Sequence, residues 1–337
     1  MPLPATMPAV TVPRPGGPEV LTLSELPLPR PAPGEVLIRV AAAGVNAPDL
    51  AQRAGHYPPP PGASELLGLE VSGEIALPAG GWSVGSRVVA LTNGGGYAGY
   101  VAVPAGQVLP VPEGWAIEDA AALPETWFTV TQGLVMRAGL TAGMQVLVTG
   151  AAGGIGGAAI QICRIAGADA IALVSSDEKA KYVLGLGARA AIRHDREDVA
   201  RRVRELTDGR GVDRVVDMVG GEATARYIEL LAPFGHLVLV ATLAGRRADL
   251  SLGAFVASHL TMSASRLRPQ TAETKAAIAA HLRRNFWAAL GDPALPRPRI
   301  KRFALAEAAG AHRALADRGH YGKIVLVTDF GTAVGNR

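Results

Sequence analysis

The sequence contains a single cysteine, Cys163, and this scarcity limits the chemistry that it can carry. One cysteine allows no disulfide within the chain and excludes a zinc site built from several cysteines. No apolar run approaches the ~20 residues that a membrane-spanning helix needs. The first residues lack the basic start and long apolar core of a secretory signal. We therefore expect a cytoplasmic protein with no membrane segment.

A long run of charge of one sign is also missing. The 33 basic and 29 acidic residues give a net charge of +4 and are scattered along the chain. A basic stripe with interleaved aromatic residues, typical of RNA-binding surfaces, is absent, so we expect no nucleic-acid partner. The 49% hydrophobic content is typical of a globular protein, and 337 residues are enough for two domains.

Glycine, by contrast, is abundant, and its most regular use lies in residues 145–167, QVLVTGAAGGIGGAAIQICRIAG. An apolar run at 146–149 indicates a strand, glycines follow at once, and the apolar spacing from 158 to 165 indicates a helix. Such a turn lets the backbone approach a pyrophosphate and directs helix N–H groups at it. Glycines also mark ordinary tight turns, but a second apolar run at 169–174 follows, as a βαβ unit requires. We expect a dinucleotide ligand.

The rest of the chain predicts two domains of different character. Short apolar runs separated by Pro and Gly fill the first third and favour a β-rich, barrel-like domain. From residue 146 strands and helices alternate, with six strands in all, which predicts an α/β fold with a doubly wound Rossmann parallel sheet. We place the first domain at 1–124, completed by 267–337, and the dinucleotide-binding domain at 125–266. The last strand, at 323–327, should fold back onto the first domain.

The residues after the second sheet strand bear on the choice of dinucleotide. NAD enzymes usually carry an acid there that bonds the ribose hydroxyls. This chain has Ser175 and Ser176, with Lys179 one helical turn later. Hydroxyls and an ammonium group suit a 2′-phosphate, which favours NADPH over NADH. Asp177 and Glu178 stand close by and weaken this preference.

Several motifs, taken together and in order, resemble the zinc-free quinone oxidoreductases of the medium-chain dehydrogenase/reductase superfamily, of the zeta-crystallin-like type. No single motif is decisive, but the resemblance covers nearly the whole chain. It implies a GroES-like, partly open barrel as the first domain. The segments that carry it are AGVN at 43–46, YPPPPG at 57–62, LGLEVSG at 67–73, LPETWFT at 123–129, the Gly-rich turn, RLRP at 266–269 and GKIV at 322–325.

Zinc-dependent relatives place a cysteine and a Gly-His-Glu sequence at their ligand positions. Here these positions hold Asn46 and Gly68-Leu69-Glu70, and a leucine side chain cannot bind a metal. We therefore expect no metal and a hydride transfer to an acceptor that needs little electrophilic help. A quinone fits, because its reduction makes the ring aromatic.

The resemblance also implies residue roles. Asn46 would hold the nicotinamide ribose or the acceptor oxygen, Tyr57 would form a wall of the substrate pocket, and Thr129 would contact the nicotinamide end. The cofactor-binding residues that it implies are Gly150, Gly153, Gly154, Ile155 and Gly156 at the pyrophosphate, Ser175, Ser176, Lys179 and His194 at the adenosine end, Val219 and Leu243 at the nicotinamide, and His320 near the cofactor.

Alternatives stay open at each of these points. Asn46 also suits an ordinary helix N-cap before Pro48, and the Tyr57 ring also suits packing on the prolines that follow it. The substrate could be an enone or enoyl thioester in place of a quinone, or the protein could bind NADPH with little turnover. An exposed apolar edge strand, expected from Leu260 to Ser265, can pair with a copy of itself, and the resemblance implies such a homodimer with one continuous sheet, unless the helix expected at 272–290 covers this edge.

Overall fold

The structure is a computed structural model that describes residues 3–264 and 266–335. The chain forms two compact units. Unit 1 comprises Met1–Phe128, Arg268–Asp292 and Arg299–Arg337, and unit 2 comprises Thr129–Leu267 and Pro293–Pro298. In the part of the chain that the structure describes, no helix is long and apolar enough to cross a membrane.

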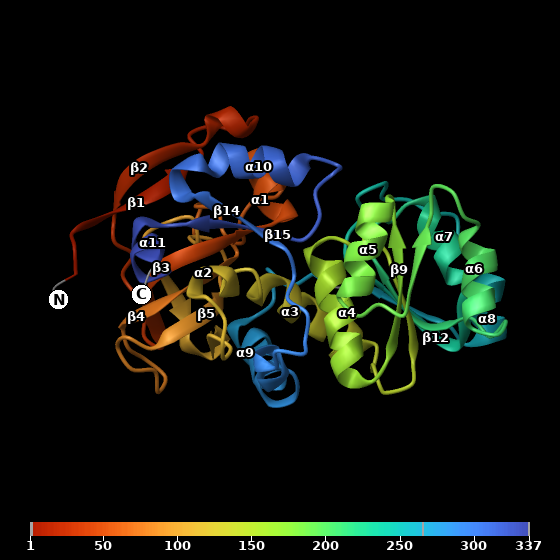
Figure 1. Ribbon diagram of the computed structural model, residues 1–337. Helices are drawn as coiled ribbons and strands as arrows, with labels where there is room; N and C mark the ends of the chain where they lie inside the picture. Colours follow the sequence, from red (N-terminus) through yellow and green to blue (C-terminus); the bar gives the residue numbers. More distant parts are fainter. Residues whose placement is uncertain (1–2, 265, 336–337) are drawn as a thin grey trace. The chain divides into compact units, whose positions relative to one another are not determined.

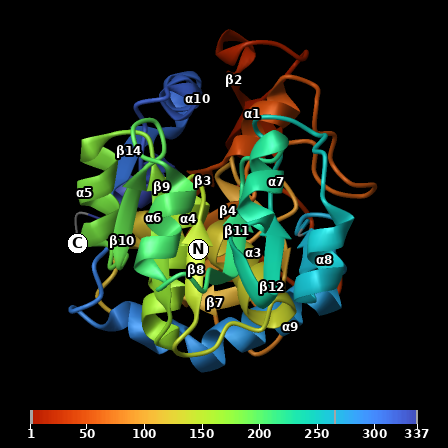
Figure 2. The same cartoon turned by 90° about the vertical axis from the view of Figure 1, so that its right-hand side faces the viewer.

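Unit 2 is built on a parallel sheet whose strands are ordered β10-β9-β8-β11-β12-β13. The first of these strands along the chain, β8, lies in the middle of the sheet, and the strand order reverses there. Figure 2 shows β10, β9, β8, β11 and β12 next to one another in this order. The strand bounds are β8 (Gln145–Val148), β9 (Asp169–Val174), β10 (Ala190–Arg193), β11 (Val212–Asp217), β12 (Leu231–Leu239) and β13 (Thr261–Ala264).

Helices cover both faces of this sheet, with α4 and α5 to one side and α6, α7 and α8 to the other (Figure 1). Coverage on both sides explains why the central strands are continuous apolar runs. Leu147, Ile171 and Val215 form a buried core with Val203 of α6 and Ile228 of α7. The helix bounds are α4 (Gly154–Ala166), α5 (Asp177–Gly185), α6 (Val199–Leu206), α7 (Glu222–Ile228) and α8 (Leu252–Ser258), and the π-helix η3 (Thr131–Arg137) precedes β8.

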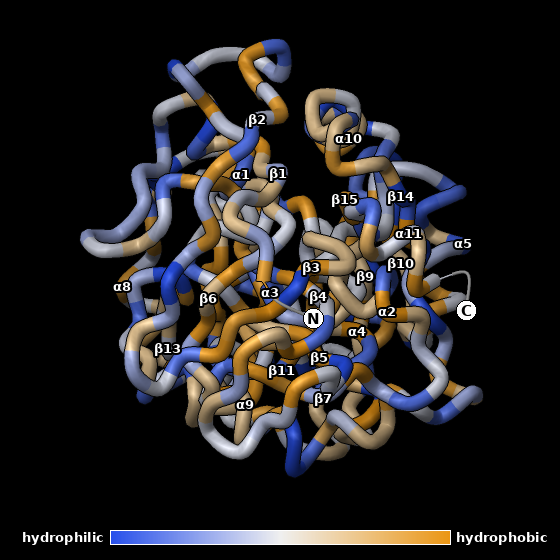
Figure 3. Tube along the Cα trace, turned by 90° about the vertical axis from the view of Figure 1, so that its left-hand side faces the viewer, coloured by the Kyte–Doolittle hydropathy of each residue, from blue (hydrophilic) through white to orange (hydrophobic). Residues whose placement is uncertain are grey.

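Unit 1 contains a sheet of mostly antiparallel strands in the order β14-β15-β3-β4-β5-β7, with β6 paired to β3, and a separate pair of β1 and β2. In Figure 3 the strands at the centre of this unit carry much of the apolar colouring, and the outer loops are bluer. The strand bounds are β1 (Thr6–Thr11), β2 (Thr22–Pro27), β3 (Glu35–Val45), β4 (Glu70–Leu77), β5 (Arg87–Leu91), β6 (Tyr100–Pro104), β7 (Val108–Pro110), β14 (Ile300–Ala304) and β15 (Lys323–Val327).

The helices of unit 1 come from both ends of the chain. Helix α1 follows β3, and α9 to α11 belong to the returning C-terminal segments. Strand β15 pairs antiparallel with β3, which brings residues near 324 next to residues near 45. The bounds are α1 (Ala47–Arg53), α2 (Ile117–Ala120), α9 (Ala272–Asn285), α10 (Ala308–Ala316) and α11 (Asp329–Gly335), with the short 3-10 helices η1 (Pro18–Val20), η2 (Ala105–Gln107), η4 (Trp287–Gly291) and η5 (Leu305–Glu307). Helix α3 (Pro124–Val130) begins in unit 1 and ends in unit 2.

The predicted fold class is confirmed, with a six-stranded parallel sheet and a separate β-rich domain. Helix α3 is α-helical to Val130 and is followed directly by the π-helix η3.

Candidate functional site

The Gly-rich turn of unit 2 connects β8 to α4 and leaves the start of that helix open to an anion. Gly150 has a φ of +54°, in the left-handed region that strains other residues. A Cβ on Gly156 would lie 2.4 Å from the Cα of Ala151, so the turn packs backbone to backbone on the helix. Gly153 is the N-cap of α4. The N–H groups of residues 154–156 therefore lie in the first helical turn, where such groups have no partner within the helix.

Asp217, the last residue of β11, connects this turn to one of the predicted nicotinamide residues. Its buried carboxylate accepts hydrogen bonds from Thr149 Oγ1 at 3.3 Å and from the N–H of Val219 at 2.8 Å. Thr224 Oγ1 donates to the second carboxylate oxygen at 2.6 Å. The ends of β8 and β11 are thus held together, and Val219 is fixed beside the turn.

Leu243, the second predicted nicotinamide residue, lies in the loop after β12 and is 75% exposed. The N–H of its neighbour Ala244 donates to the carbonyl of Val219 at 2.8 Å. Val219 and Leu243 therefore lie near each other at the carboxyl ends of two parallel strands. Open α/β sheets bind ligands at this edge.

The residues predicted for the adenosine end lie together after β9. Ser176 is the N-cap of α5, and its Oγ accepts from the N–H of Lys179 at 3.2 Å. Lys179 Nζ donates to Ser175 Oγ at 3.4 Å. The N–H of His194 donates to the carbonyl of Val174 at 3.2 Å, which places His194 at the same strand end. Two hydroxyls and an ammonium group are thus close together, and the backbone of His194 lies at the same strand end.

Arg193, the other cation near this point, is held by acids. Its Nε and Nη2 donate to the two carboxylate oxygens of Asp195 at 2.9 and 2.8 Å, and Nη1 bonds Asp177. The Arg193 guanidinium lowers the pKa of Asp195 to about 2. Arg193 is therefore neutralised, and Lys179 is the better candidate partner for a phosphate.

In unit 1, Asn46 connects β3 to α1 and takes the N-cap position, but its side chain makes no cap hydrogen bond. Asn46 Nδ2 donates to Glu70 Oε1 at 2.8 Å. Lys323 Nζ donates to Asn46 Oδ1 at 2.7 Å and to Glu70 Oε1 at 2.5 Å. All three side chains are buried, and we call them the Asn46–Glu70–Lys323 triangle. Because an acid bonds the amide nitrogen and an ammonium group bonds the amide oxygen, the orientation of the amide is defined.

Asp49 in α1 holds the backbone beside the triangle through its carboxylate. Its carboxylate accepts the N–H of Asn46 at 2.8 Å and that of Gly68 at 3.0 Å. Burial raises the pKa of Asp49 to about 6, against the effect of these two bonds. The helix N-cap function considered for Asn46 is thus only half true, because Asp49 bonds its backbone and its amide is directed elsewhere.

A further buried chain of hydrogen bonds starts at Arg53. Its Nη1 lies 3.0 Å from His312 Nδ1, and His312 Nε2 lies 3.1 Å from the Tyr97 hydroxyl. Arginine can only donate, so Nδ1 accepts and Nε2–H donates to Tyr97, which bonds Asp49. Burial lowers the pKa of His312 to about 3, which keeps the imidazole neutral.

Tyr57 lies in the loop after α1, where Arg268 contacts it. The guanidinium carbon of Arg268 is 5.4 Å from the centroid of the Tyr57 ring. Arg268 also bonds the carbonyl of Asn93 at 2.8 Å and Gln52 Oε1 at 2.8 Å, and it is almost fully buried. The Tyr57 ring is therefore not held by the following prolines alone.

The last two predicted residues are Thr129 and His320. Thr129 is buried on α3 just before the π-helix η3. His320 lies in the loop between α10 and β15, where its N–H donates to the carbonyl of Asp317 at 3.0 Å. Among the predicted residues, the structure thus groups the Gly-rich turn with Val219 and Leu243, and Ser175 and Ser176 with Lys179 and His194. Asn46 and Tyr57 flank α1 in unit 1.

The residues at the positions where zinc-dependent relatives bind their metal do not fit a zinc ion. Leu69 has no ligand atom, and Glu70 and Asn46 already bond the Lys323 ammonium group. A second cation between them would meet this ammonium at close range. No cluster of three or more His, Cys, Asp or Glu suited to a metal occurs within residues 3–264 and 266–335.

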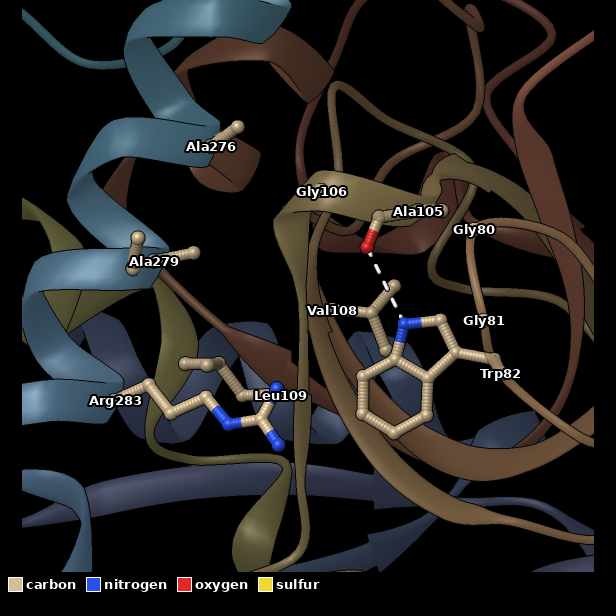
Figure 4. A pocket seen from close by; sticks show the side chains of 11 residues that line it. Gly80, Gly81, Trp82, Ala105, Gly106, Val108, Leu109, Ala276, Ala279 and Arg283 are labelled. Carbon is tan, nitrogen blue, oxygen red and sulfur yellow. Dashed lines mark hydrogen bonds between the residues drawn. The ribbon is translucent and has the colours of Figure 1, made fainter.

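A cavity of ≈ 370 Å³ in unit 1 lies apart from all these residues. It is lined mostly by small and apolar residues of the loops near β5 to β7 and of α9 (Figure 4). Trp82 forms one wall, with its indole N–H donating to the carbonyl of Ala105 at 3.3 Å. Among the residues that line this cavity, Arg283 is the only charged one. The lining therefore contains no acidic side chain and none of the residues predicted to contact the nicotinamide or the acceptor.

Sequence reasoning missed the roles of three residues. In the sequence, Glu70 stands only at a position where zinc-dependent relatives bind their metal, Lys323 only within the GKIV motif, and Asp217 in none of the motifs that carry the resemblance. Each is charged, and each stands within an apolar strand sequence where a charge has to be paired. That signal identifies a buried partner but does not say which one, because the partners lie up to 277 residues apart.

Comparisons with known proteins agree with this geometry. Residues 32–113 match the family model described as alcohol dehydrogenase GroES-like domain, and residues 154–282 match the model described as zinc-binding dehydrogenase. A quinone oxidoreductase of Pseudomonas aeruginosa is 34% identical, over 93% of this chain and 97% of its own length. A phenolphthiocerol/phthiocerol polyketide synthase subunit of Mycobacterium tuberculosis is 32% identical over 93% of this chain, which spans only 14% of the length of that subunit.

Solved structures extend the same similarity. A mycobacterial protein solved in complex with NADPH is 32% identical, with a TM-score of 0.82 over 95% of this chain and all (100%) of that one. An enoyl reductase, CurK, is 26% identical, with a TM-score of 0.83 over 96% of this chain and 99% of that one.

Proposed function

Because the chain belongs to the medium-chain dehydrogenase/reductase superfamily, as a quinone oxidoreductase-like member, we propose that it reduces quinones with NADPH and without a metal. The protein is an oxidoreductase of this superfamily that binds a nicotinamide dinucleotide. The acceptor, the preference for NADPH and the independence from zinc are the parts that we propose.

The observation that carries the proposal is the Lys323 ammonium group between Glu70 and Asn46. The ammonium group donates a hydrogen bond to Glu70, the acid at a position where zinc-dependent relatives bind their metal. The oxygens of Glu70 and Asn46 that could bind a metal are therefore already hydrogen-bonded to this ammonium group. Without a metal to polarise a carbonyl, the acceptor has to accept a hydride readily. A quinone does so because reduction makes its ring aromatic.

The residues of the chain would bind the cofactor and orient the acceptor. The bound nicotinamide supplies a hydride, and the turn at 150–156 holds the pyrophosphate with backbone N–H groups. The oxygen of the Asn46 amide and one of its N–H bonds are engaged by Lys323 and Glu70, and the second N–H is left for the acceptor oxygen or a ribose hydroxyl. Tyr57 forms a wall of the acceptor site.

The adenosine end supports NADPH as the preferred cofactor. Ser175, Ser176 and Lys179 lie together, with Lys179 Nζ donating to Ser175 Oγ, while the nearby Asp177 bonds Arg193. A 2′-phosphate would add charge-assisted hydrogen bonds to this group. The similar mycobacterial structure in complex with NADPH agrees with this choice.

The experiment that tests the proposal is the steady-state oxidation of NADPH and NADH with a panel of acceptors. The panel contains an ortho-quinone, a para-quinone, a conjugated enone and a short enoyl-CoA. We expect turnover with a quinone, faster with NADPH, and no change after dialysis against a zinc chelator. Loss of activity after chelation, restored by zinc, would contradict the proposal.

A second candidate function is the reduction of an activated C=C bond. The similarity to an enoyl reductase and to a polyketide synthase subunit favours it. The same panel separates the two, since turnover of the enoyl-CoA alone would move the substrate class from quinones to thioesters. If NADPH binds and no acceptor turns over, a binding protein with little turnover becomes the better description.

We also propose a homodimer formed through the edge of the unit 2 sheet. Strand β13 is last in the strand order and pairs only with β12 among the described residues, while Ser265 lies outside them. Leu252 and Val256 of the preceding helix α8 are 75% and 78% exposed. Analytical ultracentrifugation should give a dimer for the wild type and a monomer for Leu252→Lys with Val256→Lys. An unchanged sedimentation coefficient would exclude this interface.

A further inference from the structure

Two buried polar side chains of unit 1, Tyr97 and His312, have no part in the binding and hydride transfer described above. Their hydrogen bonds join Arg53 Nη1 to His312 Nδ1 at 3.0 Å and His312 Nε2 to the Tyr97 hydroxyl at 3.1 Å. The Tyr97 hydroxyl in turn donates to the Asp49 carboxylate. Because arginine only donates and an ionised carboxylate only accepts, every hydrogen bond in this series is directed toward Asp49.

The two carboxylate oxygens of Asp49 hold two separate segments of unit 1. Oδ2 accepts the N–H of Asn46 at 2.8 Å, where β3 passes into α1. Oδ1 accepts the N–H of Gly68 at 3.0 Å, two residues before β4 begins at Glu70. The side chains of these segments are joined by the bond from Asn46 Nδ2 to Glu70 Oε1 at 2.8 Å. The Asp49 carboxylate therefore fixes the backbone on both sides of this side-chain bond.

Gly68 also packs directly against Tyr97. Its φ is +99°, and a Cβ there would lie 2.6 Å from the backbone nitrogen of Tyr97 and 2.7 Å from its Cδ1 atom. The Gly68 carbonyl accepts Thr92 Oγ1 at 2.7 Å and the N–H of Gly96 at 3.2 Å. Tyr97 thus packs on this segment with its backbone and ring, and its hydroxyl bonds Asp49, which holds the segment. Tyr97→Phe removes the hydroxyl alone and keeps the ring packing.

We propose that Tyr97 and His312 are positioning residues that keep the Asn46 amide in place for the acceptor. They act through Asp49, and the inference rests on the proposed function, in which the second N–H of this amide bonds the acceptor oxygen or a ribose hydroxyl. Loss of the Tyr97 hydroxyl leaves the Asp49 carboxylate less firmly held, so the backbone of Asn46 is displaced. A displaced amide slows the reaction, because hydride transfer needs the reacting atoms at a defined distance and angle.

Amide hydrogen exchange, followed by NMR, tests the first step without cofactor or acceptor. The N–H groups of Asn46 and Gly68 should exchange several times faster in Tyr97→Phe than in the wild type, because their common acceptor is held less firmly. Tyr100→Phe, at a partly exposed tyrosine of β6, is the matched control and should leave both rates unchanged. Wild-type exchange at both amides in Tyr97→Phe overturns the inference.

Two substitutions of His312 test the direction of the hydrogen bonds. Glutamine can accept from Arg53 with its carbonyl oxygen and donate to Tyr97 with its N–H, whereas leucine can do neither. We expect exchange at Asn46 close to the wild-type rate in His312→Gln and faster exchange in His312→Leu. Equal exchange in these two variants overturns the role of His312.

A double-mutant cycle then tests whether the effect reaches the reaction through the Asn46 amide. With NADPH and the best acceptor of the panel, Tyr97→Phe should lower kcat about tenfold. The Kd for NADPH should stay the same, because the Gly-rich turn of unit 2 is untouched. Asn46→Ala removes the amide but keeps the backbone N–H that bonds Asp49. In the Asn46→Ala background, Tyr97→Phe should change kcat by less than about twofold.

The outcomes separate this inference from the proposed function. An equal loss of kcat from Tyr97→Phe in both backgrounds means that Tyr97 acts elsewhere, and it overturns the inference while the proposed function stands. If the wild type reduces no acceptor, the proposed function fails and the role in the reaction fails with it. The exchange rates then still decide whether Tyr97 and His312 hold Asn46.

Discussion

The two units present their functional groups in different ways. In unit 2 the Gly-rich turn offers backbone N–H groups, and its side chains are mostly hydrogen or methyl. In unit 1 the candidate groups are side chains, and most of them are buried and charged or strongly polar. The first arrangement depends on close backbone packing, and the second depends on every charge keeping its partner.

This difference predicts different kinds of sensitivity. An added methyl group at Gly156 should damage the turn of unit 2, because the atoms that it would meet are backbone atoms of Ala151. A lost charge should damage unit 1, because the remaining partner is left buried without compensation. The substitutions below test this contrast.

The largest effect should follow from Lys323→Met. It leaves the fully buried Glu70 carboxylate without its ammonium partner, which typically costs about 3–5 kcal/mol. Urea denaturation should show this loss, and Glu70→Gln in the same chain should restore part of it. Arg302→Met, which breaks an exposed pair with Asp119, should cost under about 1 kcal/mol. Equal losses for Lys323→Met and Arg302→Met would contradict the view that burial makes the triangle sensitive.

The contrast also explains what could be predicted from sequence. The strand, turn and helix at 145–167 are local, so their residue types and spacing indicate the structure directly. The alternation of strands and helices predicts the doubly wound parallel sheet of unit 2, and this fold class is confirmed. The roles of individual turn residues toward a cofactor stay predictions.

The triangle of unit 1 could not be predicted in the same way. Asn46, Glu70 and Lys323 meet only because β15 pairs with β3 and β3 pairs with β4. Glu125 joins them through a backbone N–H, which any residue type would offer. Neither periodicity nor spacing indicates such contacts, and the resemblance to a family supplied Asn46 but not its partners.

The next effect concerns Gly156→Ala. The new Cβ would lie 2.4 to 2.6 Å from backbone atoms of Ala151, and such overpacking costs about 3 kcal/mol or displaces the turn. We expect a lower melting temperature and a strong loss of NADPH binding by fluorescence titration. Gly157→Ala is the matched control, because its Cβ would meet only side-chain atoms, at 3.4 Å or more. Normal NADPH affinity in Gly156→Ala would show that the turn tolerates movement.

A smaller effect should come from the pH dependence of His312. Its folded pKa of about 3 lies below the ordinary histidine value of 6.5, so the unfolded chain takes up a proton first as the pH falls. The stability linked to His312 is therefore full above pH 6.5 and is lost toward pH 3. Between pH 7 and pH 5 this loss is about 2 kcal/mol. Urea denaturation of wild type and His312→Gln should show it in the wild type alone, and parallel curves would refute a neutral His312.

The smallest effect should come from Lys179→Ala, and it tests the cofactor preference of unit 2. Here the backbone turn is untouched, and only a partly exposed ammonium group beside Ser175 is removed. We expect the Kd for NADPH to rise about tenfold, or about 1.4 kcal/mol, while the Kd for NADH stays the same. Lys181→Ala, on the exposed side of the same helix, should change neither. If the affinity for both cofactors fell equally, Lys179 would contact the pyrophosphate or only stabilise the helix, and it would not distinguish the two cofactors. A loss confined to NADPH would mean that, even in the backbone-built unit, the distinction between the two cofactors is made by a side chain.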